Sequence, residues 1–189
     1  MGLTGGVAGV IVLVLVVLNS FGIGPAQWFG PFAQAADTRL DTDYPVLETV
    51  DVRASSTRDA VGSRTFHAAN VLDGDRSTSW HEAADDEGLG EWIELRLAEP
   101  GEIAKIIIWN GDQAEGAFHE SPRLASVIVD VDDRRFVVDL LDVDGPQAID
   151  LPEPVASDHV RLTIDGIFEG DLTRDTAVSR IEVRGNPLE

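Results

Sequence analysis

The chain contains no cysteine, which excludes both disulfides and zinc sites built on thiolates. Lysine occurs once, at Lys105, so arginine supplies the other positive side-chain charges. Residues 1–36 have no charged side chain, and all 34 acids and 14 bases lie in the rest of the chain, whose formal net charge is −20. A surface this acidic repels phosphates and anionic lipids. We therefore expect no nucleic-acid partner.

The uncharged segment contains a long apolar run over residues 3–23. About 20 helical residues span the roughly 30 Å hydrocarbon core of a bilayer. The run therefore predicts a transmembrane helix over residues 1–24, followed by a linker over residues 25–44 that opens with Pro25. Trp28 and two phenylalanines follow the run at the distance of an interfacial aromatic belt.

A cleaved signal peptide is the alternative, because residues 33–35 (AQA) resemble a small-residue cleavage site. That site lies about ten residues too far from the apolar run, and no basic residue precedes the run. The missing basic flank leaves open a cytoplasmic segment upstream of Met1. After the run, Arg39 is the only base among several aspartates. Basic residues prefer the cytoplasmic side, so we expect a single-pass membrane protein with its C-terminal domain outside the cytoplasm.

From residue 45 onward, short β-type runs alternate with Gly, Pro and Asp turns, and no long amphipathic helix appears. Asn110-Gly111 predicts a tight turn, and Asp132-Asp133 predicts a hairpin. The pattern indicates an all-β fold, a jelly-roll β-sandwich of about eight strands over residues 45–189. We expect strands at 46–54, 92–97, 103–109, 127–131, 136–141, 148–151, 160–167 and 177–183, and a short helix or strand at 66–72.

The most distinctive motif covers residues 70–80 and reads NVLDGDRSTSW. Asp73 and Asp75 flank Gly74, whose freedom of φ allows a sharp turn. Carboxylates and carbonyls in such a turn are hard oxygen ligands, which suit Ca²⁺ or a dense hydrogen-bond network. Trp80 supplies a large apolar side chain directly after the turn, and we assign it to the core.

Further motifs follow in order: GEWIELRL, IAKIIIWN, WNGDQ, LLDVDGPQ and TAVSRIEVRG. Together with the NVLDGDRSTSW loop, they resemble the discoidin (coagulation factor 5/8 type C) domains, which are galactose-binding-like β-sandwiches. Among these, the chain is most similar to the bacterial NAD-glycohydrolase translocation or glycan-binding type. The resemblance covers residues 45–185. It implies a module that binds and positions other molecules and performs no catalysis.

The resemblance also bears on a metal. Discoidin-like modules often hold a structural Ca²⁺, for which Asp73, Asp75, Thr78 and Glu182 are the candidate ligands in this sequence. At the position where the family commonly has a ligating glutamate, this chain has Arg180. A guanidinium there could pair with either aspartate. Two alternatives therefore stay open: a Ca²⁺ site, or a metal-free loop held by hydrogen bonds and Arg180.

Binding by a sandwich is expected at the loops of one end, here residues 81–90, 111–123 and 167–174. Aromatic, basic and polar groups in these loops, and at the end of one strand, suit the recognition of sugars. The candidate ligand-binding residues are Trp109, Phe118, His119, Arg123 and His81.

No catalytic pattern stands out. The four histidines lack a metal-binding spacing, and the sequence has no G-x-S-x-G turn. We expect no enzyme, but a membrane-anchored, extracytoplasmic binding module that recognises a cell-envelope or surface glycan. The alternative is a protein-protein interaction or structural domain that docks a protein partner within a complex of the bacterial cell envelope.

Overall fold

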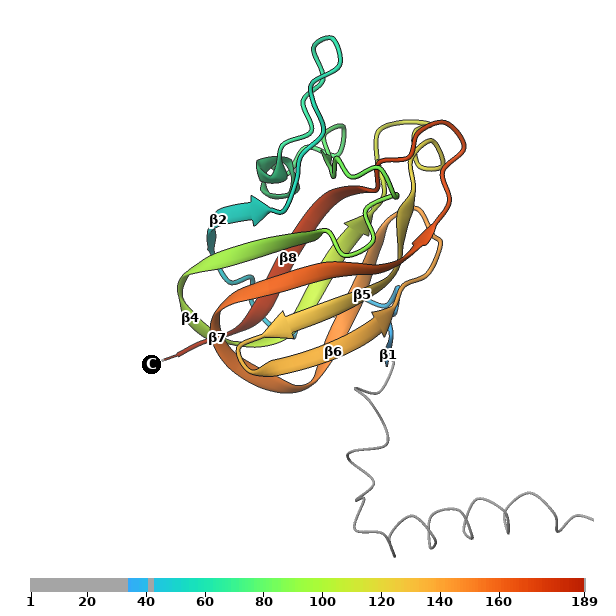
Figure 1. Cartoon of the computed structure of the whole chain (residues 1–189). Coiled ribbons are helices and arrows are strands. Elements are labelled where there is room, and N and C mark those ends of the chain that lie inside the picture. Colours follow the sequence, from blue (N-terminus) through green and yellow to red (C-terminus); the bar gives the residue numbers. More distant parts are fainter. Residues whose placement is uncertain (1–33, 41–42, 189) are drawn as a thin grey trace, which may run out of the picture. The chain divides into compact units, whose positions relative to one another are not determined.

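The computed structural model describes residues 34–40 and 43–188 as a domain built almost wholly of β-strands (Figure 1). The predicted transmembrane helix lies outside the described residues and stays a prediction. Within the described ranges, no helix combines the length and the apolar character that a membrane crossing needs.

Eight strands and one 3-10 helix make up the domain. In chain order they are β1 (Gln34–Ala35), β2 (Thr49–Ala54), η1 (Ala68–Leu72), β3 (Trp80–His81), β4 (Trp92–Asn110), β5 (Arg123–Val131), β6 (Arg134–Asp139), β7 (Pro146–Phe168) and β8 (Ala177–Pro187). The segment predicted as a short helix or strand is therefore helical at η1.

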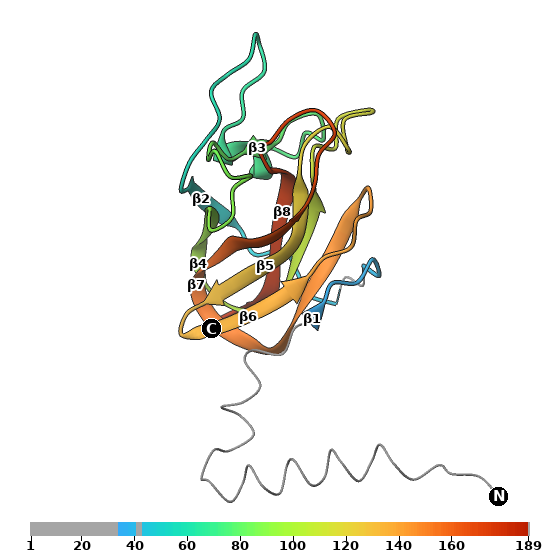
Figure 2. The same cartoon turned by 45° about the vertical axis from the view of Figure 1, so that its right-hand side comes forward.

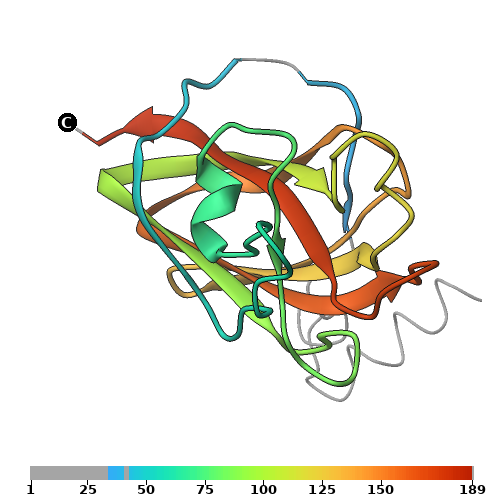
Figure 3. The same cartoon turned by 90° about the horizontal axis from the view of Figure 1, so that it is seen from above.

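Two long strands, β4 and β7, each join two of the predicted strands. They pair antiparallel along their lengths, with register shifts between Arg96 and Gly101 and between Ile103 and Lys105. The first half of β4 pairs with β2, and its second half pairs with β8. The second half of β7 pairs with β5, which pairs with β6. The continuous sheet of hydrogen-bonded strands therefore folds over itself and forms the two layers of a jelly-roll β-sandwich (Figure 3).

The apolar side chains between the layers follow the predicted alternation. Ile93, Leu95 and Leu97 are all buried on the inner face of β4, as the period of two requires. Trp80 is 1% exposed, which confirms its assignment to the core. The predicted hairpin is also confirmed, because β5 and β6 pair antiparallel around a turn in which Asp132 has a φ of 51°.

The structure differs from expectation at two places. The end of the predicted linker forms β1, which pairs in parallel with β6, and Ala36 is buried in the core. Ordered structure therefore begins before residue 45. Gly111 has the positive φ of a turn glycine, 73°, but the chain continues into a loop that reaches Arg123 instead of turning back at once. The Asn-Gly pair ends the strand without forming a two-residue hairpin.

Candidate binding site at the loop end

Four loops gather at one end of the sandwich, at the top of Figures 1 and 2. We call this region the loop end and define it as residues 55–67, 82–91, 111–122 and 169–176. The first described strand, β1, lies away from it (Figures 1 and 2).

The segment from residue 171 to 176 ties these loops together. The backbone N–H of Asp171 donates to the carbonyl of His119 at 2.8 Å. The backbone N–H of Thr176 donates to a carboxylate oxygen of Glu82 at 2.8 Å, and its hydroxyl donates to the carbonyl of Glu87 at 2.7 Å. Glu82 is fully buried, and this burial raises the pKa of its carboxyl group against the opposing effect of the backbone donors. The loop end is therefore held by hydrogen bonds between loops.

A buried polar cluster lies beneath these loops and centres on His81, which is 2% exposed. Its Nδ1 forms a hydrogen bond with the carboxylate of Asp175. Its Nε2 lies 2.8 Å from Oγ of Ser79 and 3.8 Å from the carboxylate of Asp112. The ring of Phe66 packs on the imidazole with centroids 4.4 Å apart. The imidazole therefore lies between two carboxylates that come from different loops.

Two arginines from the loop after β2 reach the same carboxylates. Arg58 donates to Asp175 and Arg64 donates to Asp112, each at 2.6 Å. Both guanidinium groups lie over Phe66, at 4.9 and 5.5 Å from the ring centroid. Burial by itself raises the pKa of Asp175, but the hydrogen bonds and charges of His81 and Arg58 outweigh it and lower that pKa.

Ser79, His81 and Asp175 follow the order of a hydrolase triad, from hydroxyl through imidazole to carboxylate. The hydroxyl of Ser79 is not available to a substrate, however, because Ser79 is 1% exposed. A buried hydroxyl cannot approach a scissile carbonyl, so this chain of hydrogen bonds positions loops and does not provide a nucleophile.

A cavity of about 400 Å³ opens beside this cluster. Side chains of three loops line it: the charged ones are Arg58, Asp59, Glu82, Arg174 and Asp175, and they lie beside aliphatic ones such as Val61. Arg174 also lines a neighbouring cavity of about 310 Å³. The loop end therefore offers a concave polar surface with guanidinium and carboxylate groups on its walls.

Two of the predicted ligand-binding residues, Phe118 and His119, belong to the loop end, and His81 and Arg123 lie at its border in strands β3 and β5. Arg123 is 4% exposed and makes two hydrogen bonds to the carboxylate of Asp142, at 2.7 and 2.9 Å. The hydrogen bond from Arg123 lowers the pKa of Asp142. Phe118 is buried beneath that guanidinium, whereas His119 is exposed beside it. His81 is buried as described above. Their assignment to ligand binding stays a prediction, with His119 as the exposed member of the four.

Trp109, the fifth predicted residue, is half-buried on the outer side of β4. The guanidinium of Arg180 lies 4.8 Å from its ring centroid. The same guanidinium donates to Glu182 at 2.6 Å, and Glu182 also accepts from Arg184 at 2.9 Å. The predicted pairing of Arg180 with the acidic loop is therefore wrong, because a nearer carboxylate on the same face of β8 takes this partner.

The acidic loop is held by its own hydrogen bonds. One carboxylate oxygen of Asp73 accepts from the backbone N–H of Asp75 and the other from the hydroxyl of Thr78, both at 2.8 Å. Asp75 accepts from the backbone and the hydroxyl of Ser77 at 2.9 and 2.8 Å. The backbone hydrogen bond from Ser77 is the main reason that the pKa of Asp75 is lowered. These contacts satisfy the carboxylates locally.

The predicted Ca²⁺ ligands do not come together around one point in the described part of the chain. Within residues 34–40 and 43–188, no group of three or more His, Cys, Asp or Glu side chains could hold a metal ion. Glu182 is engaged by two guanidinium groups, and Thr78 donates its hydroxyl proton to Asp73. Two of the four predicted ligands are therefore already engaged, and Ca²⁺ binding stays a prediction to be tested in solution.

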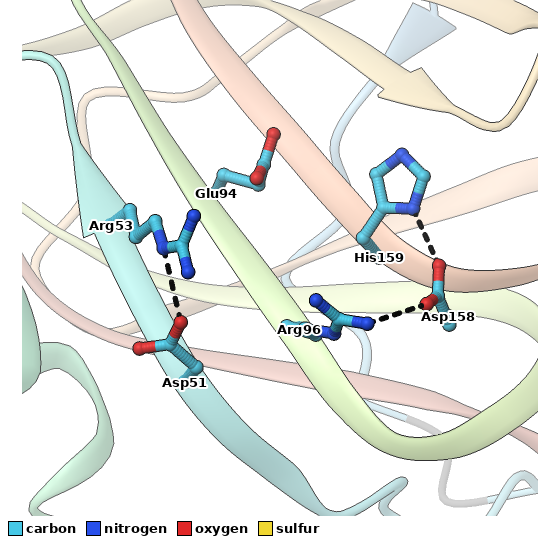
Figure 4. A pocket seen from close by; sticks show the side chains of 6 residues that line it. All are labelled: Asp51, Arg53, Glu94, Arg96, Asp158 and His159. Atoms are coloured by element: carbon cyan, nitrogen blue, oxygen red, sulfur yellow. Dashed lines mark hydrogen bonds and ion pairs between the residues drawn. The ribbon is translucent and has the colours of Figure 1, made fainter.

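A second charged region covers the outer face of the sheet formed by β2, β4 and β7 (Figure 4). Oppositely charged side chains pair within one strand, as Arg53 and Asp51 do in β2 at 3.1 Å, and between strands, as Arg96 of β4 and Asp158 of β7 do at 3.5 Å. Exposed pairs of this kind contribute little to stability. This face has a cavity of about 200 Å³, and most of the side chains that line it already form ion pairs of this kind. The face therefore provides control substitutions for the loop end. The lining residues are Asp51, Arg53, Glu94, Arg96, Asp158 and His159.

The sequence did not single out the residues that build the cavity. Arg58, Arg174 and Asp175 line the cavity, and Arg64 and Asp112 belong to the cluster beneath it. These five residues lie in three loops of the chain. Arg58 and its partner Asp175 are 117 residues apart in the sequence, and Arg64 and its partner Asp112 are 48 residues apart. No local spacing signals such pairs; covariation between homologues is the kind of signal that finds them.

The bent strands shared by both layers and the loops gathered at one end define a discoidin-like β-sandwich. Residues 43–184 match the model of the NAD glycohydrolase translocation F5/8 type C domain, and the chain belongs to this family. The resemblance inferred from the sequence is thereby confirmed. The chain matches no curated protein.

Several solved structures share the fold. CBM32-5 of CpGH89 from Clostridium perfringens, solved in complex with GalNAc-β-1,3-galactose, is 19% identical with a TM-score of 0.54, over 70% of this chain and 93% of that one. The family 32 module of C. perfringens NanJ, in complex with galactose, is 12% identical with a TM-score of 0.53, over 71% and 92%. CBM32-3 from a family 31 glycoside hydrolase of the same organism is 17% identical with a TM-score of 0.55, over 74% and 91%.

Proposed function

We propose that this domain is a non-catalytic binding module whose loop end recognises a cell-envelope or surface glycan. The observation that carries the proposal is the cavity of about 400 Å³ with guanidinium and carboxylate groups on its walls. Sugar hydroxyls donate and accept at once, and charged partners form the stronger hydrogen bonds with them. Family membership and the sugar-bound modules of the same fold support this function.

The proposal of binding without catalysis has its own support. The one hydroxyl–imidazole–carboxylate chain of the loop end, through Ser79, is closed to substrate. Asp175, which lines the cavity, already accepts from His81 and Arg58. A carboxylate held by two such donors stays ionised and is a poor general acid.

We further propose that the apolar run of residues 3–23 anchors the protein in a membrane and that the domain lies outside the cytoplasm. The position of β1, away from the loop end, supports this arrangement (Figures 1 and 2). A chain that enters the domain at β1 leaves the loop end free to meet a glycan. Mapping of an added reporter at the C-terminus to the inner or outer side of intact cells tests the topology, and an internal reporter contradicts it.

A glycan array tests the binding function directly. The purified full-length chain is compared with Arg174→Gln, which alters the cavity wall, and with Arg53→Gln, which removes another exposed guanidinium, on the outer sheet face. We expect Arg174→Gln to lower the signal of the bound glycans by about tenfold, because one charge-assisted hydrogen bond contributes 1.5–3 kcal/mol. Arg53→Gln should leave the signal unchanged. Absence of binding by the folded parent, or equal losses in both variants, rejects the proposal.

A protein partner is the second candidate, and one observation favours it. Three aliphatic side chains of the loop end are exposed: Leu172 by 74%, Val61 by 56% and Leu89 by 51%. Exposed aliphatic groups on neighbouring loops suit contact with a protein surface. This function predicts a stoichiometric partner that co-purifies with the parent and is lost with Leu172→Ser, together with no affinity for sugars.

A further inference from the structure

The cluster of Arg58, Arg64, His81, Asp112 and Asp175, in which His81 and Asp112 are buried and Arg64 is exposed, has a role that the proposed binding function does not explain. We propose that His81 is a positioning residue: it holds the two carboxylates in place, and these fix both limbs of the hairpin at residues 57–66. The inference rests on the proposed function in one respect, because residues 57–61 of this hairpin line the cavity.

The imidazole itself is fixed by a rigid frame. His81 belongs to β3 and pairs with Ala177 of β8. Its backbone N–H donates to the carbonyl of Phe66 at 3.3 Å, and Asn70 donates from its side chain to the carbonyl of Ser79 at 2.9 Å. A side chain on such a frame can orient the groups that bind to it. The position of the imidazole is therefore set by β8, by η1 and by the two ends of the hairpin, because Arg58 also donates its backbone N–H to the carbonyl of His81 at 2.9 Å.

From this fixed point, the imidazole contacts one carboxylate on each side. Nδ1 bonds to Asp175, which comes from the loop before β8. Nε2 lies 3.8 Å from Asp112, which comes from the loop after β4, and 2.8 Å from the hydroxyl of Ser79. Buried carboxylates without donors are costly. The imidazole thus stabilises two acidic groups that would otherwise have fewer partners.

Each carboxylate then holds one limb of the hairpin. Arg58 lies on the outgoing limb and pairs with Asp175, while Arg64 lies on the returning limb and pairs with Asp112. Backbone hydrogen bonds between the limbs join Val61 and Arg64, at 3.0 and 3.1 Å. A hairpin with so short a ladder is marginal by itself. Backbone hydrogen bonds to His81 already hold its base at Arg58 and Phe66. The two arginine side chains are further anchors, which set the orientation of the limbs and with it the wall of the cavity.

Hydrogen exchange of the hairpin amides tests this proposal without any ligand. In the full-length chain, Asp175→Asn should speed exchange in the outgoing limb by about tenfold, and Asp112→Asn should do the same in the returning limb. His81→Gln should speed exchange in both limbs, because it acts on both carboxylates. His159→Gln is the matched control, since that histidine pairs with Asp158 on the outer sheet face. It should leave the hairpin unchanged.

The proposal is overturned if His81→Gln leaves the hairpin amides as in the parent, or if it speeds exchange equally throughout the domain. If His81→Gln does not fold, the ¹⁵N NMR chemical shifts of the His81 imidazole are compared instead between the parent and the two aspartate variants. Asp175→Asn should move the Nδ1 signal, and Asp112→Asn should move the Nε2 signal. If neither signal moves, the imidazole does not organise the two carboxylates and the proposal fails.

The glycan array, repeated with these variants, separates this inference from the proposed function. If the parent binds a glycan, His81→Gln and Arg58→Gln should each weaken binding by about tenfold, and the double variant should lose little more, as expected for residues that act as one unit. Additive losses contradict the positioning role. If the parent binds no glycan, the proposed function fails, and hydrogen exchange alone decides whether His81 positions the hairpin.

Discussion

Two acidic regions of this domain are built in opposite ways. In the acidic loop, Asp73 and Asp75 accept hydrogen bonds from residues two to five positions away, and both side chains are exposed. In the His81 cluster, Asp175 accepts from residues 94 and 117 positions away and is largely buried. The first region is a property of a short segment, whereas the second exists only when distant loops meet.

This difference decides what each region contributes. An exposed carboxylate that loses a local donor takes a water molecule in its place, so little free energy is lost. A buried carboxylate that is removed leaves its cationic partners unpaired in a site of low dielectric constant. The His81 cluster should therefore matter for stability and for the shape of the loop end, and the acidic loop should matter for neither.

The largest effect should come from Asp175→Ala. This change leaves Arg58 and His81 without their shared acceptor, and we expect the free energy of unfolding to fall by about 3 kcal/mol. Urea denaturation measures the loss. Asp73→Ala is the matched change in the acidic loop, and its melting temperature should stay within about 2 °C of the parent. Equal losses in the two variants would show that the two regions do not differ.

Two glycines provide the next test. Gly74 and Gly88 both have positive φ, at 76° and 82°, so alanine at either position costs about 1 kcal/mol in backbone strain. A Cβ on Gly74 meets nothing within 4 Å, whereas a Cβ on Gly88 comes within 2.6 Å of Glu82, which backbone donors hold in place. We expect Gly88→Ala to destabilise the domain by about 2 kcal/mol and Gly74→Ala by about half of that, as measured by urea denaturation. A larger loss in Gly74→Ala contradicts the comparison.

Low pH should reveal the difference between the two regions through a smaller change in stability. The pKa of Asp175 is lower in the folded state than in the unfolded state, where it is about 3.9. The stabilising contribution of this carboxylate is therefore fully present above the unfolded pKa. It is lost as the pH falls from that value through the lower folded pKa. The parent should therefore lose stability below about pH 4, and Asp175→Asn, already weaker at neutral pH, should lose less over this range. Melting temperatures measured from pH 7 to 3 give the comparison. An Asp175→Asn curve parallel to that of the parent would falsify it.

The smallest effect should be that of Ca²⁺. The carboxylates of the acidic loop are already satisfied by Thr78, Ser77 and backbone groups, and Glu182 is held by two arginines. We expect the melting temperature to be the same in millimolar Ca²⁺ and in chelator, because an ion that binds the folded state would raise it. A rise of several degrees with Ca²⁺, absent from Asp73→Ala, would establish the alternative of a metal site.

Much of the architecture could be predicted from local sequence. The alternation around Ile93 and Leu95 marks a half-buried strand, and Trp80 after the acidic turn marks the core. The local pattern does not predict the fusion of strands into β4 and β7, because Pro100 and Gly101 in β4, and Pro152 and Pro154 in β7, look like breaks. In the structure, the register of β4 against β7 shifts between Arg96 and Gly101, so the strand continues beyond the proline. Gly101 packs closely against Leu47, because a Cβ added to this glycine would lie 2.9 Å from the Leu47 side chain.

The sequence by itself determined the β-sandwich and the family, because their signals have short periods or spacings: alternation along a strand, and motifs that follow one another in a fixed order. Only the tertiary structure decided which polar groups are buried together. The pairing of Arg58 with Asp175 and the position of His81 between two carboxylates depend on how the bent strands bring distant loops to one end. Such contacts are selected by burial and by distance in space, which no short stretch of sequence encodes.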